Sequence, residues 1–260
     1  MDNVKTEDYR VLLPPPRTIG TEAPLRWLKL GWQDFKKIPV LSTSYGVVML
    51  LITLIIAWVA FHANNLVVVF ALLGGFFFIG PALGIGLYLM SRQLANDKTP
   101  TLKRCVQEAR KNLSNTLVLS LVFLIIFLVW ARAASMVHIF FPSSGGASAA
   151  DLAVFLSVGS AIGAMFAAIV FCAGAFSIPM MMDRDIDAVT AVLTSISAVL
   201  RNKKAMLIWG AIIGASVLVG VLLGLIGLVV TLPVIGHATW HAYQEVIDIQ
   251  AWDLSATEQA

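Results

Sequence analysis

Long apolar runs alternate with short charged segments along the chain, and the lengths of these runs suit a lipid bilayer. A helix needs about 20 predominantly apolar residues to cross the hydrocarbon core of a membrane. The runs cover residues 45–61, 66–90, 116–140, 152–182 and 205–243. Since the last run is too long for one crossing, we predict two spans there, with a tight turn near Val219–Leu223. The pattern therefore predicts an all-α, polytopic membrane helix bundle with six transmembrane helices.

Basic residues mark one side of these predicted spans. Of the 18 Lys and Arg residues, seven precede the first span, six lie between the second and third, and four lie between the fourth and fifth. Arg132, inside the third span, is the exception. Because Lys and Arg accumulate in the cytoplasmic loops of membrane proteins, we predict a multi-pass protein with both termini in the cytoplasm. Residues 1–24 and the acidic residues 247–260 then form tails that flank a membrane domain over residues 25–246.

A short amphipathic helix is predicted three times within this domain, each time ahead of a span. The apolar residues follow the i, i+3, i+4, i+7 spacing of one helix face. They are Leu25, Leu28, Trp32 and Phe35 in the first helix, Leu102, Cys105, Val106, Ala109 and Leu113 in the second, and Val189, Val192, Leu193, Ile196, Val199 and Leu200 in the third. Basic residues close each helix, where they complement its C-terminal dipole and lipid headgroups: Lys36, Lys37, Arg110, Lys111, Arg201, Lys203 and Lys204.

The order of elements suggests an internal repeat with units at about residues 25–91, 99–182 and 187–246. Each unit contains an amphipathic helix, a spanning helix and a return helix with a proline, which is Pro81, Pro179 or Pro233. Proline removes a backbone hydrogen bond and kinks or breaks a helix. We therefore predict a threefold repeat of an amphipathic helix plus a transmembrane hairpin. The alternative is that proline is simply frequent in membrane helices.

Composition agrees with this pattern and excludes several classes of protein. Hydrophobic residues make up 58% of the chain and charged residues 13%, against about 25% charged in soluble domains. The mean hydropathy is +0.85, which excludes a soluble globular domain, a disordered chain and a coiled coil. A net charge of +3 is too small to predict nucleic-acid binding. The expected partners are membrane lipids and other membrane-protein subunits.

Glycine pairs at four-residue spacing occur within the predicted spans. The pairs are Gly80 with Gly84, Gly159 with Gly163, Gly210 with Gly214, and Gly220 with Gly224. Small residues at this spacing let two helix backbones approach closely. We expect most of these faces to pack within the chain, and packing against another subunit is the alternative.

The most specific candidate for chemistry is a histidine pair in the last predicted span. His237 and His241 are four residues apart, which places both imidazoles on one helix face. Two such nitrogens can share a metal ion or bind haem axially. However, structural zinc sites need three or four ligands, and the sequence predicts no defined metal site. The alternative is that both are ordinary interfacial or hydrogen-bonded histidines, with no cofactor.

Other chemical signals point away from catalysis. The acidic segment Asp183–Asp187 lacks the spacing of a calcium-binding loop and contains Arg184, so we expect salt bridges and helix capping there. Nucleophile, zinc-protease and phosphate-loop motifs are all absent from the sequence. We therefore predict no catalytic residues and no enzyme activity.

Four segments together resemble a known family: LKLGWQDFKKIP at 28–39, GPALGIGLYLMSRQ at 80–93, IPMMMDRDIDAVTAVLTSISAVL at 178–200, and LPVIGHATWHAYQEV at 232–246. They are similar to the bacterial integral membrane proteins of domain of unknown function 2189, and the resemblance covers about Leu25 to Val246. It implies a six-span protein of the bacterial cytoplasmic (inner) membrane. It implies no reaction, cofactor or partner, although descriptions of relatives sometimes invoke an oxidase subunit.

Three functions are compatible with these observations. The first, which we favour, is an accessory, assembly or scaffolding subunit of a larger membrane complex, plausibly a respiratory one. The second is a lipid-binding or transporter-like protein, since repeated hairpins with kinked return helices suit such a role. The third is a haem-binding or metal-binding redox protein that uses His237 and His241.

Overall fold

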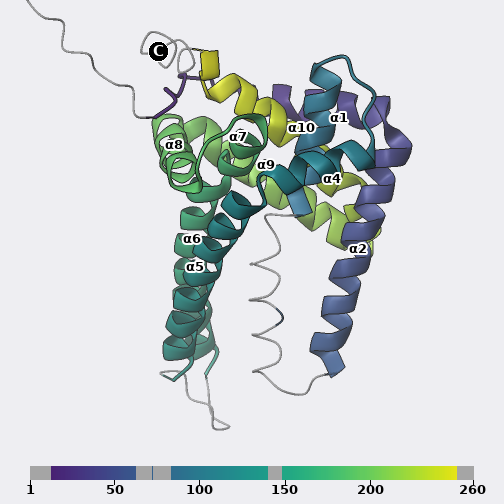
Figure 1. Ribbon diagram of the computed structural model, residues 1–260. Coiled ribbons are helices and arrows are strands. Elements are labelled where there is room, and N and C mark those ends of the chain that lie inside the picture. The colour runs from purple at the N-terminus through teal and green to yellow at the C-terminus, as the bar shows by residue number, and fades with distance from the viewer. Residues whose placement is uncertain (1–12, 63–71, 73–82, 140–147, 251–260) are drawn as a thin grey trace, which may run out of the picture.

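The computed structural model describes residues 13–62, 72, 83–139 and 148–250 (Figure 1). These residues form helices, turns and one isolated β-bridge between Pro16 and Ile247. The helices are α1 (Ala23–Lys37), α2 (Pro39–His62), a helix over residues 83–95, α4 (Leu102–Lys111), α5 (Leu113–Ile139), α6 (Ala149–Gly174), α7 (Ser177–Asp183), α8 (Ala188–Arg201), α9 (Lys203–Leu222) and α10 (Leu228–Val246). The predicted all-α class is confirmed.

Within the part of the chain that the structure describes, four stretches of helix are long and apolar enough to cross a membrane: Pro39–His62, Leu113–Met136, Ala149–Asp183 and Lys203–Leu222. In the most apolar part of Ala149–Asp183, 0% of the residues are buried within the protein. The second predicted span, over residues 66–90, lies mostly outside the described residues. The six-span count therefore remains a prediction.

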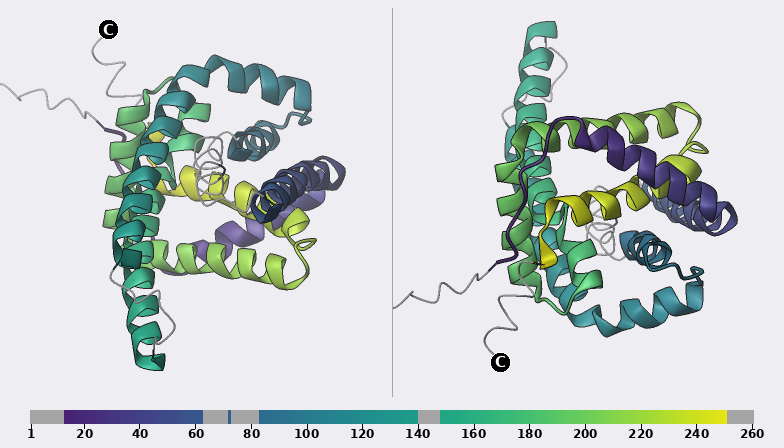
Figure 2. Two further views of the ribbon diagram at one scale, coloured as in Figure 1. Left: turned by 90° about the horizontal axis from the view of Figure 1, so that it is seen from below. Right: turned by 90° about the horizontal axis from the view of Figure 1, so that it is seen from above.

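The last predicted pair of spans is a helical hairpin, α9 and α10. The turn was expected near Val219–Leu223, but α9 continues to Leu222 and α10 begins at Leu228. Gly224 and Leu225 have positive φ angles of 70° and 69° in this turn, which reverses the chain. Figure 2 shows α9 and α10 running across the view while α2 is seen almost end on. The hairpin is therefore steeply inclined to α2.

The amphipathic helices α1, α4 and α8 lie together at one end of the molecule, which we call the charged end (Figure 1). Each joins the following long helix through a single residue: Ile38 between α1 and α2, Asn112 between α4 and α5, and Asn202 between α8 and α9. This shared connection agrees with the order of elements in the predicted repeat. The threefold repeat itself stays a prediction.

The three amphipathic helices bury small and polar residues together with a few bulky ones, such as Trp27, Phe35 and Val199, and leave other bulky apolar residues exposed. In α1, Gly31 and Asp34 are buried, whereas Leu25 and Trp32 are exposed. The same division holds in α4, with Cys105 buried and Leu102 and Val106 exposed, and in α8, with Ala191, Thr194, Ser195 and Ala198 buried and Val189, Leu193 and Leu200 exposed. Exposed apolar side chains beside basic residues are typical of helices that lie on a membrane surface.

The protein core is concentrated near the charged end. Helix α10 packs against α1, α2, α7 and α9, and its neighbour α1 provides the largest of these contacts. The indole rings of Trp27 in α1 and Trp209 in α9 meet edge to face, with their centroids 5.5 Å apart. The segment before α1 is also fastened here, because the Arg17 amide donates to the Val246 carbonyl and the Asn202 side chain bonds both Ile19 and Arg17.

The prolines act in different ways. Pro179 lies in the first turn of α7, directly after α6 ends at Gly174. Since proline has no amide hydrogen and clashes with the carbonyl four residues earlier, it explains why the helix is interrupted near residue 175. Pro233 lies inside α10, which continues past it. Pro81 lies outside the described residues.

Most of the described glycine pairs do not pack within the chain, contrary to our expectation. Around Gly159, Gly163 and Gly214 there is open space within 4 Å of the position a side chain would take. A side chain at Gly210 would meet only the Phe171 ring, 3.9 Å away. Gly220 is the contrasting case, because it is covered by Leu228. These helix faces are open because the neighbouring helices of the chain pack elsewhere.

The close packing of α1 on α10 depends on Gly31. A Cβ atom there would lie 2.6 Å from the Ala238 nitrogen and 2.6 Å from the Val234 oxygen. We expect Gly31→Ala to lower the free energy of unfolding by about 1–3 kcal/mol, because the backbones must separate. Gly214→Ala is the matched control, since alanine gains about 0.5–1 kcal/mol of helix propensity where nothing obstructs it. Thermal unfolding in detergent measures both. A Gly31→Ala variant as stable as the control would contradict this packing argument.

Candidate functional site

Buried polar side chains gather where α1, α2, the helix over residues 83–95 and α10 meet. Asp34 of α1 is 4% exposed, and His237 of α10 is 0% exposed. Ser42 of α2 and Ser91 of the helix over residues 83–95 are also buried, and His241 of α10 is partly buried. We call these five residues the Asp34 cluster. Burying such groups is costly unless each finds a hydrogen-bond partner.

A continuous series of hydrogen bonds connects the Asp34 cluster. His241 Nε2 lies 2.8 Å from Asp34 Oδ2, and Ser91 Oγ donates to the same oxygen at 2.9 Å. Ser91 Oγ also lies 2.8 Å from His237 Nδ1, and Ser42 Oγ lies 2.9 Å from His237 Nε2. The carboxylate of one amphipathic helix is thus linked to three other helices.

The proton positions follow from the donor and acceptor capacity of each group. An ionised carboxylate only accepts, and a serine hydroxyl has one proton to donate. Ser91 uses that proton on Asp34, so its oxygen accepts from the Nδ1–H of His237. Neutral His237 then accepts at Nε2 from the Ser42 hydroxyl. Each hydrogen bond in the cluster therefore has one donor and one acceptor.

The surroundings of Asp34 favour its ionised form. Burial by itself raises the pKa of this carboxyl group, but the hydrogen bond and charge of His241, followed by the hydrogen bond from Ser91, outweigh burial and hold the pKa of Asp34 below its ordinary value. The Lys37 ammonium is 3.8 Å away, but its side chain is 61% exposed. Water screens such an exposed pair strongly, so His241 and Ser91 are the principal partners.

The geometry of the Asp34 cluster suits a structural role, in which it holds helices together, better than a catalytic one. Ser42 donates to Nε2 of His237, and Ser91 holds the same imidazole at Nδ1. A hydroxyl nucleophile is activated by the same kind of arrangement, a base that a third group orients. However, Ser42 and His237 are both 0% exposed, so a substrate has no access to them. The arrangement holds the helices together through satisfied polar contacts.

The structure places both sequence-predicted histidines in this cluster. His237 and His241 do share one face of α10, but they point to hydrogen-bond partners on other helices. Both ring nitrogens of His237 are occupied by serine hydroxyls. Within the described residues, no group of three or more His, Cys, Asp or Glu side chains is arranged to hold a metal ion. The donor set therefore does not fit a metal or haem site, and the geometry favours hydrogen-bonded histidines.

Asp34, Ser42 and Ser91 were not identified from the sequence. Asp34 lies on the polar side of an amphipathic helix, where a solvated carboxylate is the usual expectation. Ser42 and Ser91 are single hydroxyls beside apolar runs, and no spacing connects them with Asp34. Only the burial of that polar side singles out Asp34, and burial depends on how α1 packs.

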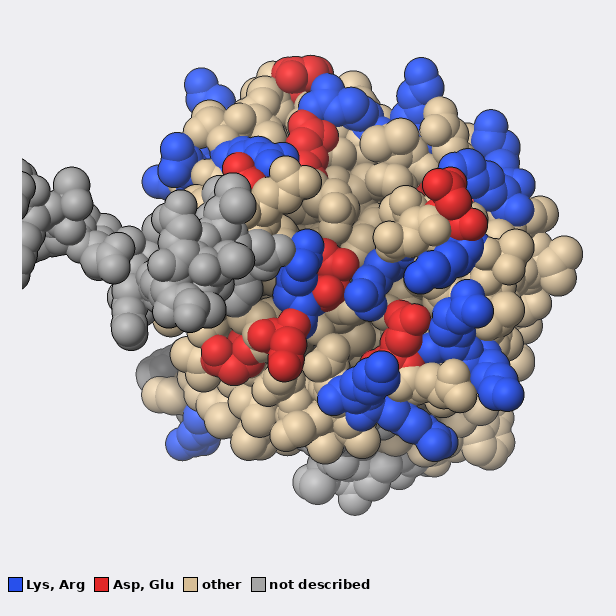
Figure 3. Space-filling view, turned by 45° about the horizontal axis from the view of Figure 1, so that its top comes forward, with Lys and Arg blue, Asp and Glu red and all other residues tan. Residues whose placement is uncertain are grey.

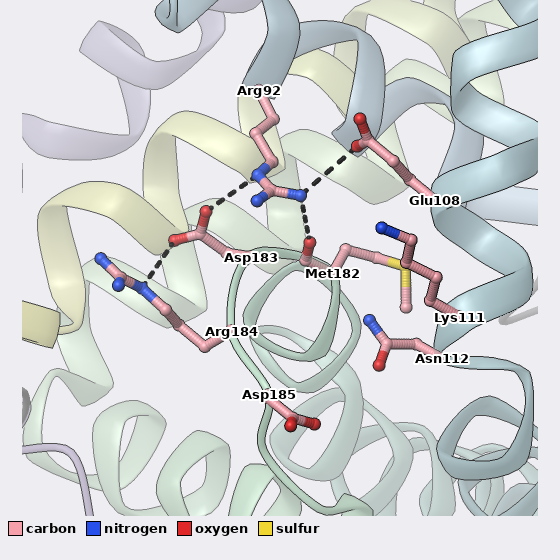
Figure 4. Close-up of a pocket in the computed structure, with 8 residues that line it drawn as sticks. All are labelled: Arg92, Glu108, Lys111, Asn112, Met182, Asp183, Arg184 and Asp185. Carbon is pink, nitrogen blue, oxygen red and sulfur yellow. Dashed lines mark hydrogen bonds and ion pairs between the residues drawn. The ribbon is translucent and has the colours of Figure 1, made fainter.

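A second polar cluster lies at the charged end and surrounds a pocket of about 470 Å³ (Figure 4). Arg92 is at its centre: it binds Asp183 at 3.2 Å, Glu108 at 3.4 Å and the Met182 carbonyl oxygen at 2.8 Å. Asp183 also accepts from the Tyr243 hydroxyl at 2.9 Å. We call this cavity the charged pocket; it is lined by Arg92, Glu108, Lys111, Asn112, Met182, Asp183, Arg184 and Asp185.

The acidic segment Asp183–Asp187 forms the salt bridges and helix cap expected from the sequence. Arg92 and Arg184 both pair with Asp183, the latter at 3.6 Å. Asp187 is the N-cap of α8, where its carboxylate accepts from the amides of Val189 and Thr190.

The predicted basic residues lie at the charged end, where Figure 3 shows Lys and Arg gathered around intervening acidic side chains. Lys36 and Lys37 end α1, Arg110 and Lys111 end α4, Arg201 ends α8, and Lys203 and Lys204 begin α9. Some of them have specific neighbours: Lys37 lies 3.8 Å from Asp34, Lys111 lines the charged pocket, and Arg201 Nε donates to the Thr18 hydroxyl at 3.1 Å. Their binding to lipid remains a prediction.

The Asp34 cluster predicts the effect of removing its charge. Asp34→Asn keeps the side-chain volume but loses the ionised acceptor of two hydrogen bonds, so we expect a loss of about 2 kcal/mol of unfolding free energy at neutral pH. Lys37→Gln, the control, should cost about 0.5 kcal/mol or less because Lys37 is exposed.

The same prediction has a defined pH dependence. The pKa of Asp34 is lower in the folded protein than in the unfolded chain. Its ionised form therefore contributes its full stabilisation above the ordinary aspartate pKa of about 4, and this contribution disappears as the pH falls through the lower pKa of the folded protein. The difference in denaturation midpoint between wild type and Asp34→Asn should therefore shrink in acid. Equal stability of the two at neutral pH would show that the cluster does not fasten α1.

Comparisons with known proteins support the resemblance carried by the sequence motifs. No curated protein and no solved structure matches the chain. A family model does match it, over residues 67–183, which include the helix over residues 83–95, α4 to α7 and the MDRD segment. Over residues 67–183 the chain is therefore similar to the family described as predicted integral membrane protein (DUF2189).

Proposed function

We propose that this membrane protein is an accessory, assembly or scaffolding subunit of a larger membrane complex. The observation that carries the proposal is the open glycine face of α6. Among the described residues, none reaches within 4 Å of the Cβ positions of Gly159 and Gly163, and this spacing favours close approach of another helix in a membrane. A respiratory complex is the partner class suggested by descriptions of related sequences.

The groove beside this face supports the same proposal. It has a volume of about 490 Å³ and lies between α5 and α6. Gly163 lines this groove together with aromatic and aliphatic side chains, including Phe127, Trp130 and Phe166. Lipid-exposed helices associate through shape and van der Waals packing, which a groove beside a small-residue face provides.

Co-purification from native membranes in polymer-bounded nanodiscs tests this role. We expect the wild-type chain to bring a membrane protein with it in a fixed ratio. The double variant Gly159→Leu/Gly163→Leu should lose that protein because leucine blocks the close approach. Ala161→Leu, on the opposite face of α6, is the matched control and should retain it. A wild-type chain recovered only as a stable monomer, or loss of the protein in both variants, would refute the proposal.

We also propose six crossings of a bacterial inner membrane, with both termini in the cytoplasm. Support comes from the basic residues that collect at the charged end, since such residues accumulate on the cytoplasmic side. The α9–α10 hairpin is the critical element for the number of crossings, because it is steeply inclined to α2. The side of the membrane on which its turn lies therefore decides whether α9 and α10 cross.

Single-cysteine labelling tests this topology in a Cys105→Ala/Cys172→Ala background. In intact cells, a membrane-impermeant maleimide should label Leu223→Cys in the α9–α10 turn from outside. Lys98→Cys, between the helix over residues 83–95 and α4, should react only after the membrane is permeabilised. Failure to label Leu223→Cys from outside, while Lys98→Cys behaves as expected, would contradict the crossing by α9 and α10.

The two other functions predicted from the sequence have unequal support. A redox role through His237 and His241 has none in the geometry, because both imidazoles are committed to the Asp34 cluster. A lipid-binding role is favoured by one specific observation, the mixed charges of the charged pocket.

A further inference from the structure

We propose that the charged pocket binds the headgroup of a zwitterionic phospholipid, one that carries both a phosphate and a primary ammonium group. The proposal goes beyond the accessory role and does not depend on it. It rests on the charges that line the pocket, on the position of the pocket and on the apolar path that leads from it.

The formal charges of the pocket lining balance. Arg92, Lys111 and Arg184 are positive, and Glu108, Asp183 and Asp185 are negative. A purely anionic ligand would meet three carboxylates, and a purely cationic one would meet three cations. A ligand with one charge of each sign can place each group beside its complement, which gives specificity as well as affinity.

Several of these charges already have partners that shape the pocket. Arg92 is occupied by Asp183, Glu108 and the Met182 carbonyl. In contrast, Lys111 and Asp185 form neither an ion pair nor a side-chain hydrogen bond with any part of the chain that the structure describes. Figure 4 shows Lys111 at the end of α4 and Asp185 on the link that follows α7, with Asn112 beside them. One cation and one anion are thus available for a ligand.

The pocket lies at the depth where lipid headgroups are expected. Its walls come from the end of α4 and the link between α7 and α8. Exposed apolar residues of the amphipathic helices α4 and α8, such as Val106 and Leu193, are suited to entering the upper part of a lipid layer. A headgroup therefore reaches the pocket without leaving the membrane surface.

An apolar path starts beside the pocket. Asn112 lines the pocket, and α5 begins at the next residue. Leu113, Leu117 and Leu121 on α5 are all about half exposed, and their four-residue spacing places them in one row along the helix. An acyl chain attached to a headgroup in the pocket can lie along this row, which favours a lipid over a small soluble molecule.

Native mass spectrometry of the full-length chain, released from detergent, tests the proposal. The probes are phosphatidylethanolamine, phosphatidylcholine and phosphatidylglycerol with identical acyl chains. We expect phosphatidylethanolamine to bind best, because its ammonium can donate hydrogen bonds to Asp185 whereas the quaternary amine of phosphatidylcholine cannot. Equal or better binding of phosphatidylglycerol would overturn the proposal.

Matched variants connect the binding with the pocket. The double variant Lys111→Gln/Asp185→Asn should weaken phosphatidylethanolamine binding about tenfold or more, a loss of about 1.4 kcal/mol or more. The control Lys103→Gln/Asp97→Asn makes the same charge changes at α4 and at the turn before it, outside the pocket, and should bind like wild type. Equal binding by the pocket variant and the control would overturn the proposal.

Competition with free phosphoethanolamine distinguishes the source of the headgroup. If millimolar phosphoethanolamine leaves lipid binding unchanged, the pocket requires the acyl chains and the ligand is a membrane lipid, as proposed. If it displaces the lipid completely, the pocket recognises a soluble zwitterion and the assignment to a lipid is wrong. Circular dichroism of each variant confirms that the helices are retained.

Discussion

A carboxylate that leaves water must find hydrogen bonds or charges inside the protein, and the packing of the charged end is organised around one such group. Asp34 accepts hydrogen bonds from His241 of α10 and from Ser91 of the helix over residues 83–95. Ser91 in turn positions His237, and His237 reaches Ser42 on α2. Removing the central carboxylate takes the acceptor from Ser91 and His241, so α1 loses its polar link to α10 and to the helix over residues 83–95.

The burial of Asp34 accompanies an unusual division of faces in α1. A helix on the surface of a soluble protein buries its bulky apolar face. Helix α1 buries Gly31 and Asp34 beside Trp27, and it leaves the bulky residues Leu25 and Trp32 exposed. Gly31 allows the close approach to α10 that brings Asp34 to His241. Leu25 and Trp32 stay 64% and 44% exposed, and a lipid surface is a medium that accommodates such apolar side chains. Polar fastening and membrane contact thus occupy opposite faces of one helix.

Glycine has two different consequences in this molecule, depending on what lies opposite. At Gly31 and Gly46 a neighbouring helix fills the space that a side chain would take, and the backbones of α1 and α2 contact α10. At Gly159 and Gly163 on α6 that space is open. The first pair stabilises the fold by close packing, whereas the second leaves a surface suited to another helix. Gly31 and Gly46 lie on different helices and form no four-residue pair, so the neighbouring helix, rather than the spacing, decides which glycines pack closely.

Local features of the chain were predictable because they depend on residues close together in sequence. Hydrophobic periodicity and length correctly predicted α2, α5, α6 and α9 as helices long enough to span a membrane. The capping role of Asp187 followed from its position before a helix, and the i, i+4 spacing placed His237 and His241 on one face of α10.

The sequence by itself determined the membrane environment, the helical class, the basic residues near the helix ends and the shared face of the two histidines. Only the tertiary structure decided that this face meets Asp34, Ser91 and Ser42, that Arg92 pairs with Asp183 and Glu108, and that the glycines of α6 stay open. The reason is physical: hydrophobic pattern fixes which residues leave water, but it carries no information on which helix lies opposite. Hydrogen bonds between residues as distant as Ser42 and His237 need helices that are already packed together. Gly31 in α1 and Gly46 in α2 allow the close approach of these helices to α10.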